Sequence, residues 1–199
     1  MRSEPYDQGM TSGAGSSRRS ARERLLETAD RLFYDNGIHD VGIDRILQES
    51  GVAKGSLYYN FSGKDELVQE YLRRQHARWV ARIDEAVARE VDPRAKILAV
   101  FDALRPIFAE PDFRGCPVHS ADNNPSGSPE GVAVTKFRAW LRDLFAGPVE
   151  ELGYTGSHPL VTQLVVLFDG ANIAAVADSD PQAASAARSA AEALLPVRV

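Results

Sequence analysis

Hydrophobic residues along this 199-residue chain recur at helical spacing almost everywhere after residue 18. The first stripe predicts a helix that ends at Asn36-Gly37, with the glycine in the left-handed conformation common at helix ends. Its apolar positions are Leu25, Ala29, Leu32 and Phe33. Two short amphipathic segments follow, one around 43–47 that ends at Gly51 and one over 53–61. No segment shows a convincing strand pattern, so we expect an all-α fold.

The later helices are predicted from their boundary residues. Ser62-Gly63-Lys64-Asp65 is typical of a capping box, and it opens a helix that can extend to about residue 90. Four pairs place a capping residue before proline at a helix start: Asp92-Pro93, Ser128-Pro129, His158-Pro159 and Asp180-Pro181. We expect Pro106 to kink or end its helix and Gly147-Pro148 to interrupt another. Residues 110–130 are expected to be largely loop, with room for a short helix over 113–121.

Composition narrows the class of protein. The single cysteine, Cys116, cannot form an internal disulfide. No wholly apolar run approaches the ~18 residues of a membrane helix. The longest apolar-rich stretch, 160–177, is interrupted by Thr162, Gln163, Asp169, Gly170 and Asn172. No apolar signal segment follows the N-terminus. These features predict a soluble cytoplasmic protein with a disordered, Gly/Ser-rich arm over residues 1–17.

Charge is unevenly distributed along the chain. The net charge of −5 argues against a nucleic-acid partner when it is taken as a whole. Residues 15–78, however, carry +1 and residues 79–199 carry −5. Four arginines, Arg18, Arg19, Arg22 and Arg24, cluster at the start of the first helix. Such a cluster suits contact with phosphates, although a solvated helix turn has the same composition.

The two short segments suggest a more specific function. A short helix, a turn at Gly51 and a second short helix form a helix-turn-helix arrangement over about 42–61, whose second helix enters the major groove of DNA. In that helix Leu57 and Phe61 face the core, while a cation, a bare backbone position and two tyrosines share the outer face: Lys54, Gly55, Tyr58 and Tyr59. These groups suit phosphate and base-edge contacts. Taken singly, Tyr58 also fits simple packing, and Lys54 and Lys64 fit simple solvation.

The segment RERLLETADRLFYDNGIHDVGIDRILQESGVAKGSLYYNFSGKDEL resembles the DNA-binding domain of TetR-family transcriptional regulators, over about 19–72. The matching elements are A-x-x-L-F-x-x-x-G, I-x-x-I-x-x-x-x-G-V, K-G-x-L-Y-x-x-F and K-[DE]-x-L. The resemblance implies an all-α homodimeric repressor that a small molecule releases from a palindromic operator. By position it assigns DNA contact to Lys54, Gly55, Ser56, Tyr58, Tyr59 and Asn60, and phosphate contact to Lys64. Gly42 replaces the usual Ser or Thr, and Asn60 a frequent His.

The C-terminal half is less constrained. FRGCPVHSADNN and LFDGANIAA resemble a subset of the same family. We expect domains at 18–79 (DNA binding) and 80–199 (ligand binding and dimerisation), with the last two helices, about 159–178 and 181–195, pairing between subunits. Small residues would allow close helix approach there: Gly170, Ala171, Ala174, Ala175, Ala184, Ala187 and Ala191. Candidate effector-lining residues are Trp79, Phe101, Leu104, Phe108, Phe113, Cys116, His119, Phe137, Trp140, Phe168 and Asn172, although core packing explains each of them as well.

Other functions have less support in the sequence. A small-molecule enzyme would need a phosphate loop, paired carboxylates or metal-ligand spacing, and we find none of these. Cys116 and His119 are too few for a metal site and lack an orienting third group for catalysis. Nothing in the sequence indicates that Cys116 is a reactive thiolate. We therefore expect no enzyme activity, cofactor or metal, and no membrane partner. A non-specific architectural DNA-binding protein remains the other alternative.

Overall fold

The computed structural model describes residues 19–118, 127–156 and 158–196. Over these residues it contains eight α-helices and no strand, as the hydrophobic periodicity predicts. The helices are α1 (Ala21–Asn36), α2 (Ile43–Ser50), α3 (Lys54–Asn60), α4 (Lys64–Ala88), α5 (Pro93–Phe108), α6 (Pro129–Glu151), α7 (Pro159–Ala177) and α8 (Ala183–Leu194). The predicted N-terminal arm, Arg18 and His119 lie outside the described residues.

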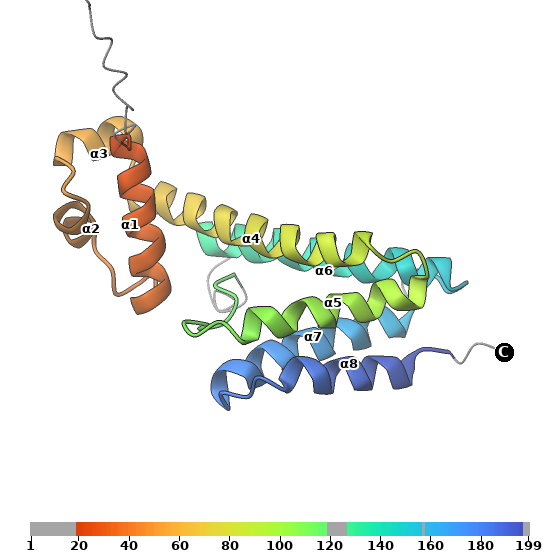
Figure 1. Ribbon diagram of the computed structural model, residues 1–199. Coiled ribbons are helices and arrows are strands. Elements are labelled where there is room, and N and C mark those ends of the chain that lie inside the picture. The colour runs from red at the N-terminus through yellow and green to blue at the C-terminus, as the bar shows by residue number, and fades with distance from the viewer. Residues whose placement is uncertain (1–18, 119–126, 157, 197–199) are drawn as a thin grey trace, which may run out of the picture.

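Helices α1, α2 and α3 form a small unit at the N-terminal end of α4 (Figure 1). Ser20 caps α1 through a complete capping box with Glu23: each side chain accepts a hydrogen bond from the backbone amide of the other residue. Gly37 ends α1 as predicted, but with φ +87° and ψ +151° it is not in the left-handed helical conformation expected there. Apolar side chains from all four helices meet beneath α3 and exclude water from the centre of the unit: Leu25, Leu32, Phe33, Ile46, Leu57, Phe61 and Leu67.

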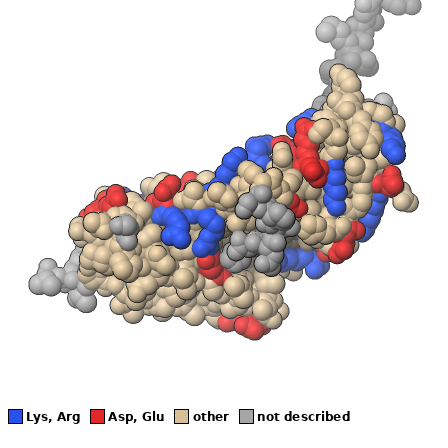
Figure 2. All heavy atoms as spheres, turned by 180° about the vertical axis from the view of Figure 1, so that it is seen from behind, with Lys and Arg blue, Asp and Glu red and all other residues tan. Residues whose placement is uncertain are grey.

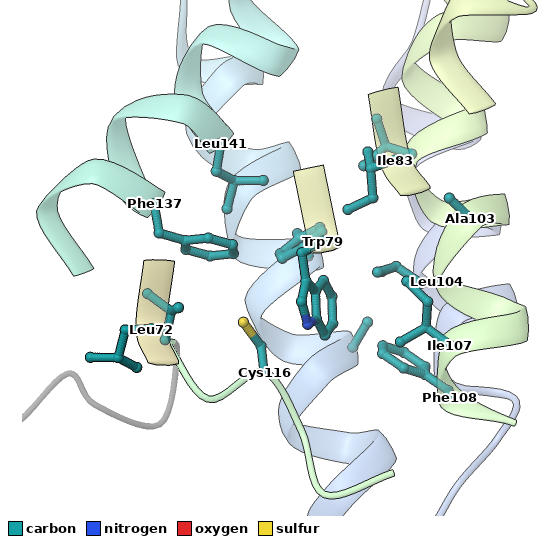
Figure 3. Close-up of a cluster of buried hydrophobic side chains, with 14 of the residues drawn as sticks. Leu72, Trp79, Ile83, Ala103, Leu104, Ile107, Phe108, Cys116, Phe137 and Leu141 are labelled. Carbon is teal, nitrogen blue, oxygen red and sulfur yellow. The ribbon is translucent and has the colours of Figure 1, made fainter. Parts of the chain in front are cut away.

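The distal part of α4 packs with α5, α6, α7 and α8 in a second, larger unit (Figure 1). Figure 3 shows Trp79 of α4 at its centre, with Phe137 and Leu141 of α6 on one side and Leu104, Ile107 and Phe108 of α5 on the other. Trp79 is 6% exposed and Phe137 only 1%. The predicted domain boundary at residue 79 therefore falls inside a helix that belongs to both units.

The structure differs from the sequence prediction at several points along the helices. The N-cap of α4 is Gly63 and not Ser62, and the Glu66 carboxylate accepts a hydrogen bond of 2.7 Å from the backbone amide of Ser62. Pro106 and Pro148 both lie inside continuous helices. Each proline removes one backbone hydrogen bond, but each lies in the last turn of its helix, where few bonds follow it. Residues 113–118, the described part of the expected short helix, are not helical.

Helix α7 qualifies one expectation about membrane spans. Its best 18-residue window has a mean hydropathy of 1.7, so by length and composition alone α7 is apolar enough to cross a membrane, despite its polar interruptions. Core helices of other proteins pass the same test, and 39% of this window is buried inside the molecule. Arg138 of α6 also forms a 2.6 Å ion pair with Asp169 in the middle of α7. Helix α7 therefore packs against the rest of the chain and has one side exposed to solvent.

Candidate nucleic-acid interface

The turn between α2 and α3 is fixed by three adjacent residues. Gly51 adopts the left-handed conformation at φ +62° and ψ +26°, which bulkier residues resist. The Ser50 hydroxyl donates to the Leu47 carbonyl and accepts from the Val52 amide, both at 3.3 Å. Val52 is buried at 5% exposure and anchors the start of α3. The angle between the two helices is therefore set by hydrogen bonds and by burial.

Helix α3 has one buried and one exposed face. Leu57 is fully buried and Phe61 is 2% exposed, whereas Tyr58 is 52% and Tyr59 90% exposed. A tyrosine with nine-tenths of its surface in water gains little from the fold itself, since burial of apolar area is what stabilises an aromatic side chain. Lys54 is also exposed at the first position of the helix. The face predicted from the sequence is the face that the structure presents to solvent.

Two predicted contact residues are partly engaged within α3. The side-chain amide of Asn60 donates to the Ser56 carbonyl at 2.7 Å. Both residues are half-buried, in contrast to the tyrosines between them. The hydrogen bond fixes the Asn60 amide group and uses one of its two N–H donors. Because Ser56 and Asn60 are less exposed than Tyr59, they are weaker candidates for base contact.

Two glycines leave open space on this surface. A Cβ added to Gly55 or to Gly42 would meet no atom of the protein within 4 Å. Gly55 lies inside a helix, where glycine destabilises by roughly 0.5–1 kcal/mol relative to alanine. Internal packing therefore does not explain it. Gly42 is the N-cap of α2 and supplies no side-chain hydrogen bond, as expected for a residue without a hydroxyl.

The arginines of α1 differ in their surroundings. Arg19 is largely exposed and forms a 2.6 Å ion pair with Glu27. The guanidinium of Arg22 lies 5.2 Å from the centre of the Phe61 ring and 3.8 Å from a Glu70 oxygen. Figure 2 shows basic and acidic side chains interspersed around this end of the molecule. The cluster is therefore not a uniform basic patch, and Arg22 has internal partners that its sequence position did not reveal.

Lys64 begins α4, and its position also suits an anion. The N-cap Gly63 provides no side-chain acceptor for the amides of the first turn, and such free amides attract phosphate. Asp65 and Glu66 share that turn. Hydrogen bonds from Ser62, first from its backbone amide, hold the pKa of Glu66 below its usual range. Glu66 therefore stays ionised and opposes part of the attraction of Lys64.

The predicted effector residues occupy the core of the second unit, in more than one group. Phe137 lies next to Phe168 and Trp140, with ring centres 6.2 and 5.4 Å apart, and Trp79 lies 6.4 Å from Phe168. Phe108 contacts Phe113 at 5.0 Å. Two other members lie within this core: Leu104 is fully buried and the Cys116 side chain points towards the cluster (Figure 3). Phe101 stacks on Phe145 instead, at 5.8 Å.

One polar side chain is buried in this unit without full pairing. Asn172 of α7 is 2% exposed, and its amide nitrogen donates to the Phe168 carbonyl at 3.0 Å. Its side-chain oxygen has no hydrogen-bond partner among the described residues. A buried acceptor without a donor is unfavourable by about 1–3 kcal/mol, so it is suited to receive a donor from a ligand. No described group of three or more His, Cys, Asp or Glu residues is arranged to hold a metal.

The outer side of α7 shows a feature that sequence reasoning missed. Val166, Ile173 and Val176 are 61%, 57% and 44% exposed, and Gly170 lies between them on the surface. The view from behind shows a largely neutral surface over the C-terminal helices (Figure 2). Because α7 is apolar on most sides, its sequence alone does not separate this stripe from the core. Four predicted interface residues are instead buried within the chain: Ala171, Ala184, Ala187 and Ala191.

Helix α2, the turn at Gly51 and the exposed helix α3 form the arrangement found in the helix-turn-helix class of DNA-binding proteins. Residues 25–71 match the family model described as bacterial regulatory proteins, tetR family. A TetR-family transcriptional regulator from Streptomyces coelicolor is 33% identical, with a TM-score of 0.79 over 87% of this chain and 93% of its own. A second such structure, from Streptomyces avermitilis, is 30% identical, with a TM-score of 0.72 over 87% and 99%.

The chain belongs to the TetR family of transcriptional regulators. It is also similar to the transcriptional regulator LmrA of Bacillus subtilis, with 35% identity over 100 residues. That match spans 49% of this chain and 53% of LmrA. The uncharacterised regulator YxaF from the same organism is 50% identical over 56 residues, which is 28% of this chain and 29% of YxaF. The similarity to these curated relatives thus covers about half of their length or less.

Proposed function

We propose that the protein is a homodimeric repressor that binds operator DNA through α3 and is released by a small molecule bound in the core of the second unit. Residues 18–79 would read DNA, and residues 80–199 would bind the effector and form the dimer. The observation that supports this most directly is Tyr59, which is 90% exposed on the helix that would enter the DNA groove. The family names describe regulators and not enzymes, and a cytoplasmic location without a membrane partner fits that role.

The DNA side is tested by titrating the promoter upstream of the protein's own gene at several salt concentrations. We expect Tyr59→Ala to weaken binding by about five- to a hundredfold, because one good base-edge contact amounts to ~1–3 kcal/mol. Tyr154→Ala is the matched control, since Tyr154 is also exposed but lies in the second unit. Undiminished binding by Tyr59→Ala would contradict the role of α3. Equal affinity for promoter and unrelated DNA would favour an architectural protein.

The dimer is supported by the exposed stripe of α7. Val166, Gly170 and Ile173 follow one another at spacings of four and three residues, so they lie on one side of the helix. An apolar stripe on a helix face is typically covered by a partner. A two-fold dimer would place two copies of α3 about 34–36 Å apart, one turn of DNA. We expect Ile173→Glu to give monomers in sedimentation, whereas Val91→Glu, at an equally apolar but isolated exposed site, should leave the dimer intact.

Release by an effector is supported by the aromatic core around Trp79, Phe137 and Phe168 with the unpaired oxygen of Asn172. We expect a mostly apolar molecule with one hydrogen-bond donor directed at that oxygen. A compound library is screened for release of the labelled promoter. We expect Asn172→Leu to bind DNA normally and to lose sensitivity to the compounds that release the promoter from the wild type. A compound that acts equally on both proteins would contradict this placement of the effector.

A further inference from the structure

Arg22 of α1 lies between the end of α3 and α4, with 46% of its side chain exposed. Its guanidinium lies 5.2 Å from the centre of the Phe61 ring, and Phe61 is the residue that ends α3. The same guanidinium lies 3.8 Å from an oxygen of Glu70, which belongs to α4. One side chain of α1 thus contacts the end of α3 and the first half of α4 together.

Glu70 is the shared acceptor at this junction. Arg73 donates two hydrogen bonds of 2.8 Å to its two oxygens, and Arg74 lies 3.4 Å away. These charges, with the Arg73 hydrogen bond first, hold the pKa of Glu70 below its usual range. The Glu70 side chain is only 15% exposed, so its ion pairs are screened less than those at a free surface. The Glu70 carboxylate that faces Arg22 is therefore ionised and held in position.

The contacts continue back to α1. Arg74 also lies 3.4 Å from Asp30, which is 8% exposed, and Arg78 lies 3.6 Å from the same carboxylate oxygen. Arg22 and Asp30 are both on α1, two turns apart. Ion pairs thus connect α1 with α4 at two sites, and Arg22 is the site that also contacts α3.

Phe61 gives Arg22 a route to the DNA-facing residues. Phe61 is 2% exposed, and its backbone amide donates to the Leu57 carbonyl at 2.8 Å. The ring is therefore fixed relative to the last turn of α3, where Tyr58 and Tyr59 lie. Because Arg22 lies over that ring, a change at Arg22 alters the constraint on the end of α3. A planar guanidinium interacts with an aromatic face in a way that an ammonium group reproduces poorly.

We propose that Arg22 is a positioning residue that sets the orientation of α3 through Phe61 and Glu70, and so controls the discrimination between operator and other DNA. This assigns it a different role from Arg19, which is exposed and has no aromatic partner among the described residues. A residue that binds phosphate strengthens binding to every sequence alike, because the backbone is the same everywhere. A residue that orients the recognition helix affects base contacts and therefore mainly specific binding.

The experiment measures binding of the full-length protein to the promoter and to unrelated duplex DNA, each over a range of salt concentrations. The variants are Arg22→Gln and Arg22→Lys, with Arg19→Gln as the matched control. We expect both Arg22 variants to lose about three- to tenfold in operator affinity, with unrelated DNA little affected. The salt dependence should stay unchanged, whereas loss of one phosphate contact lowers its slope by about 0.9. Equal losses on both DNAs with a lower slope would overturn the proposal.

Two further measurements exclude a general loss of folding. Thermal unfolding of each variant is followed, and binding is measured far below its midpoint. The double variant Arg22→Gln/Glu70→Gln is then compared with the two single variants. If Arg22 acts through Glu70, the losses in operator affinity are not additive. Additive losses would overturn the proposed route. The inference rests on the proposed function, but wild-type protein that binds no operator would refute that function, whereas these variants test Arg22 alone.

Discussion

The two units joined by α4 differ in where their predicted functional residues lie. In the first unit they are on the surface: Tyr59 is 90% exposed, and Gly55 leaves open space beside it. In the second unit they are inside: Phe168 is fully buried and Asn172 is 2% exposed. The proposed DNA contacts and the proposed effector contacts thus place opposite demands on side chains of the same chain. Substitutions at functional residues should therefore change binding without changing stability in the first unit, and should change both together in the second.

The largest expected effect tests this comparison directly. We expect Phe168→Ala to lower the free energy of unfolding by about 3–5 kcal/mol, because it leaves a cavity beside Trp79 and Phe137. Tyr59→Ala should stay within about 0.5 kcal/mol of the wild type, because little of that side chain is buried. Urea denaturation at one fixed protein concentration measures both. Similar losses in the two variants would show that the two units do not differ in this way.

Gly55→Ala should move stability and function in opposite directions. Alanine in a helix is favoured over glycine by roughly 0.5–1 kcal/mol, and the added methyl group meets nothing within the protein. We therefore expect a more stable protein that binds its operator more weakly, if DNA approaches the backbone at this point. The midpoint of urea denaturation and the dissociation constant for the promoter are measured on the same preparation. Unchanged operator binding would remove Gly55 from the interface.

Gly42→Ser tests the same comparison by adding a hydroxyl group that can cap α2 and contact a phosphate. The backbone at Gly42, with φ −87° and ψ 160°, accepts serine, and its hydroxyl can cap α2. We expect a gain of only a few tenths of a kcal/mol in stability, because glycine is itself tolerated at an N-cap. Operator binding should tighten more than stability rises, because the hydroxyl also suits a phosphate. Gly42→Ala, which adds a methyl group without a hydroxyl, should give neither gain.

The smallest effect concerns pH and the second unit. Burial, followed by the charge of Lys136, lowers the pKa of His76, whose ring lies against Phe137 and Trp140. The unfolded chain then binds more protons than the folded one, so stability is full above about pH 6.5 and falls as the pH drops towards the lowered pKa. We expect His76→Phe to lose less stability than the wild type between pH 7.5 and 5.5. Urea midpoints at both pH values provide the test, and identical pH dependence would contradict it.

The fold was predictable from the sequence where local signals agree. Gly51 and Leu57 define the turn and the buried side of α3, because glycine conformation and helical spacing act over a few residues. The effect of Pro106 was less predictable, because it falls in the last turn of α5, where few backbone hydrogen bonds follow it. The α7 stripe was not predictable, since a helix apolar on most sides does not reveal which side the rest of the chain covers. Arg22 was predicted from its charge alone, and its partners Phe61 and Glu70 become neighbours only after folding.

The continuity of α4 has a consequence for angular precision. Its 25 residues span about 37 Å, since a helix rises 1.5 Å per residue. A tilt of only ~5° about one end of such a rod displaces the other end by ~3 Å, by the same geometry. Hydrogen bonds tolerate only a few tenths of an ångström in length. A side-chain rearrangement around Trp79 that rotates the helix by a few degrees is therefore large enough to move α3 out of hydrogen-bonding distance of a base edge.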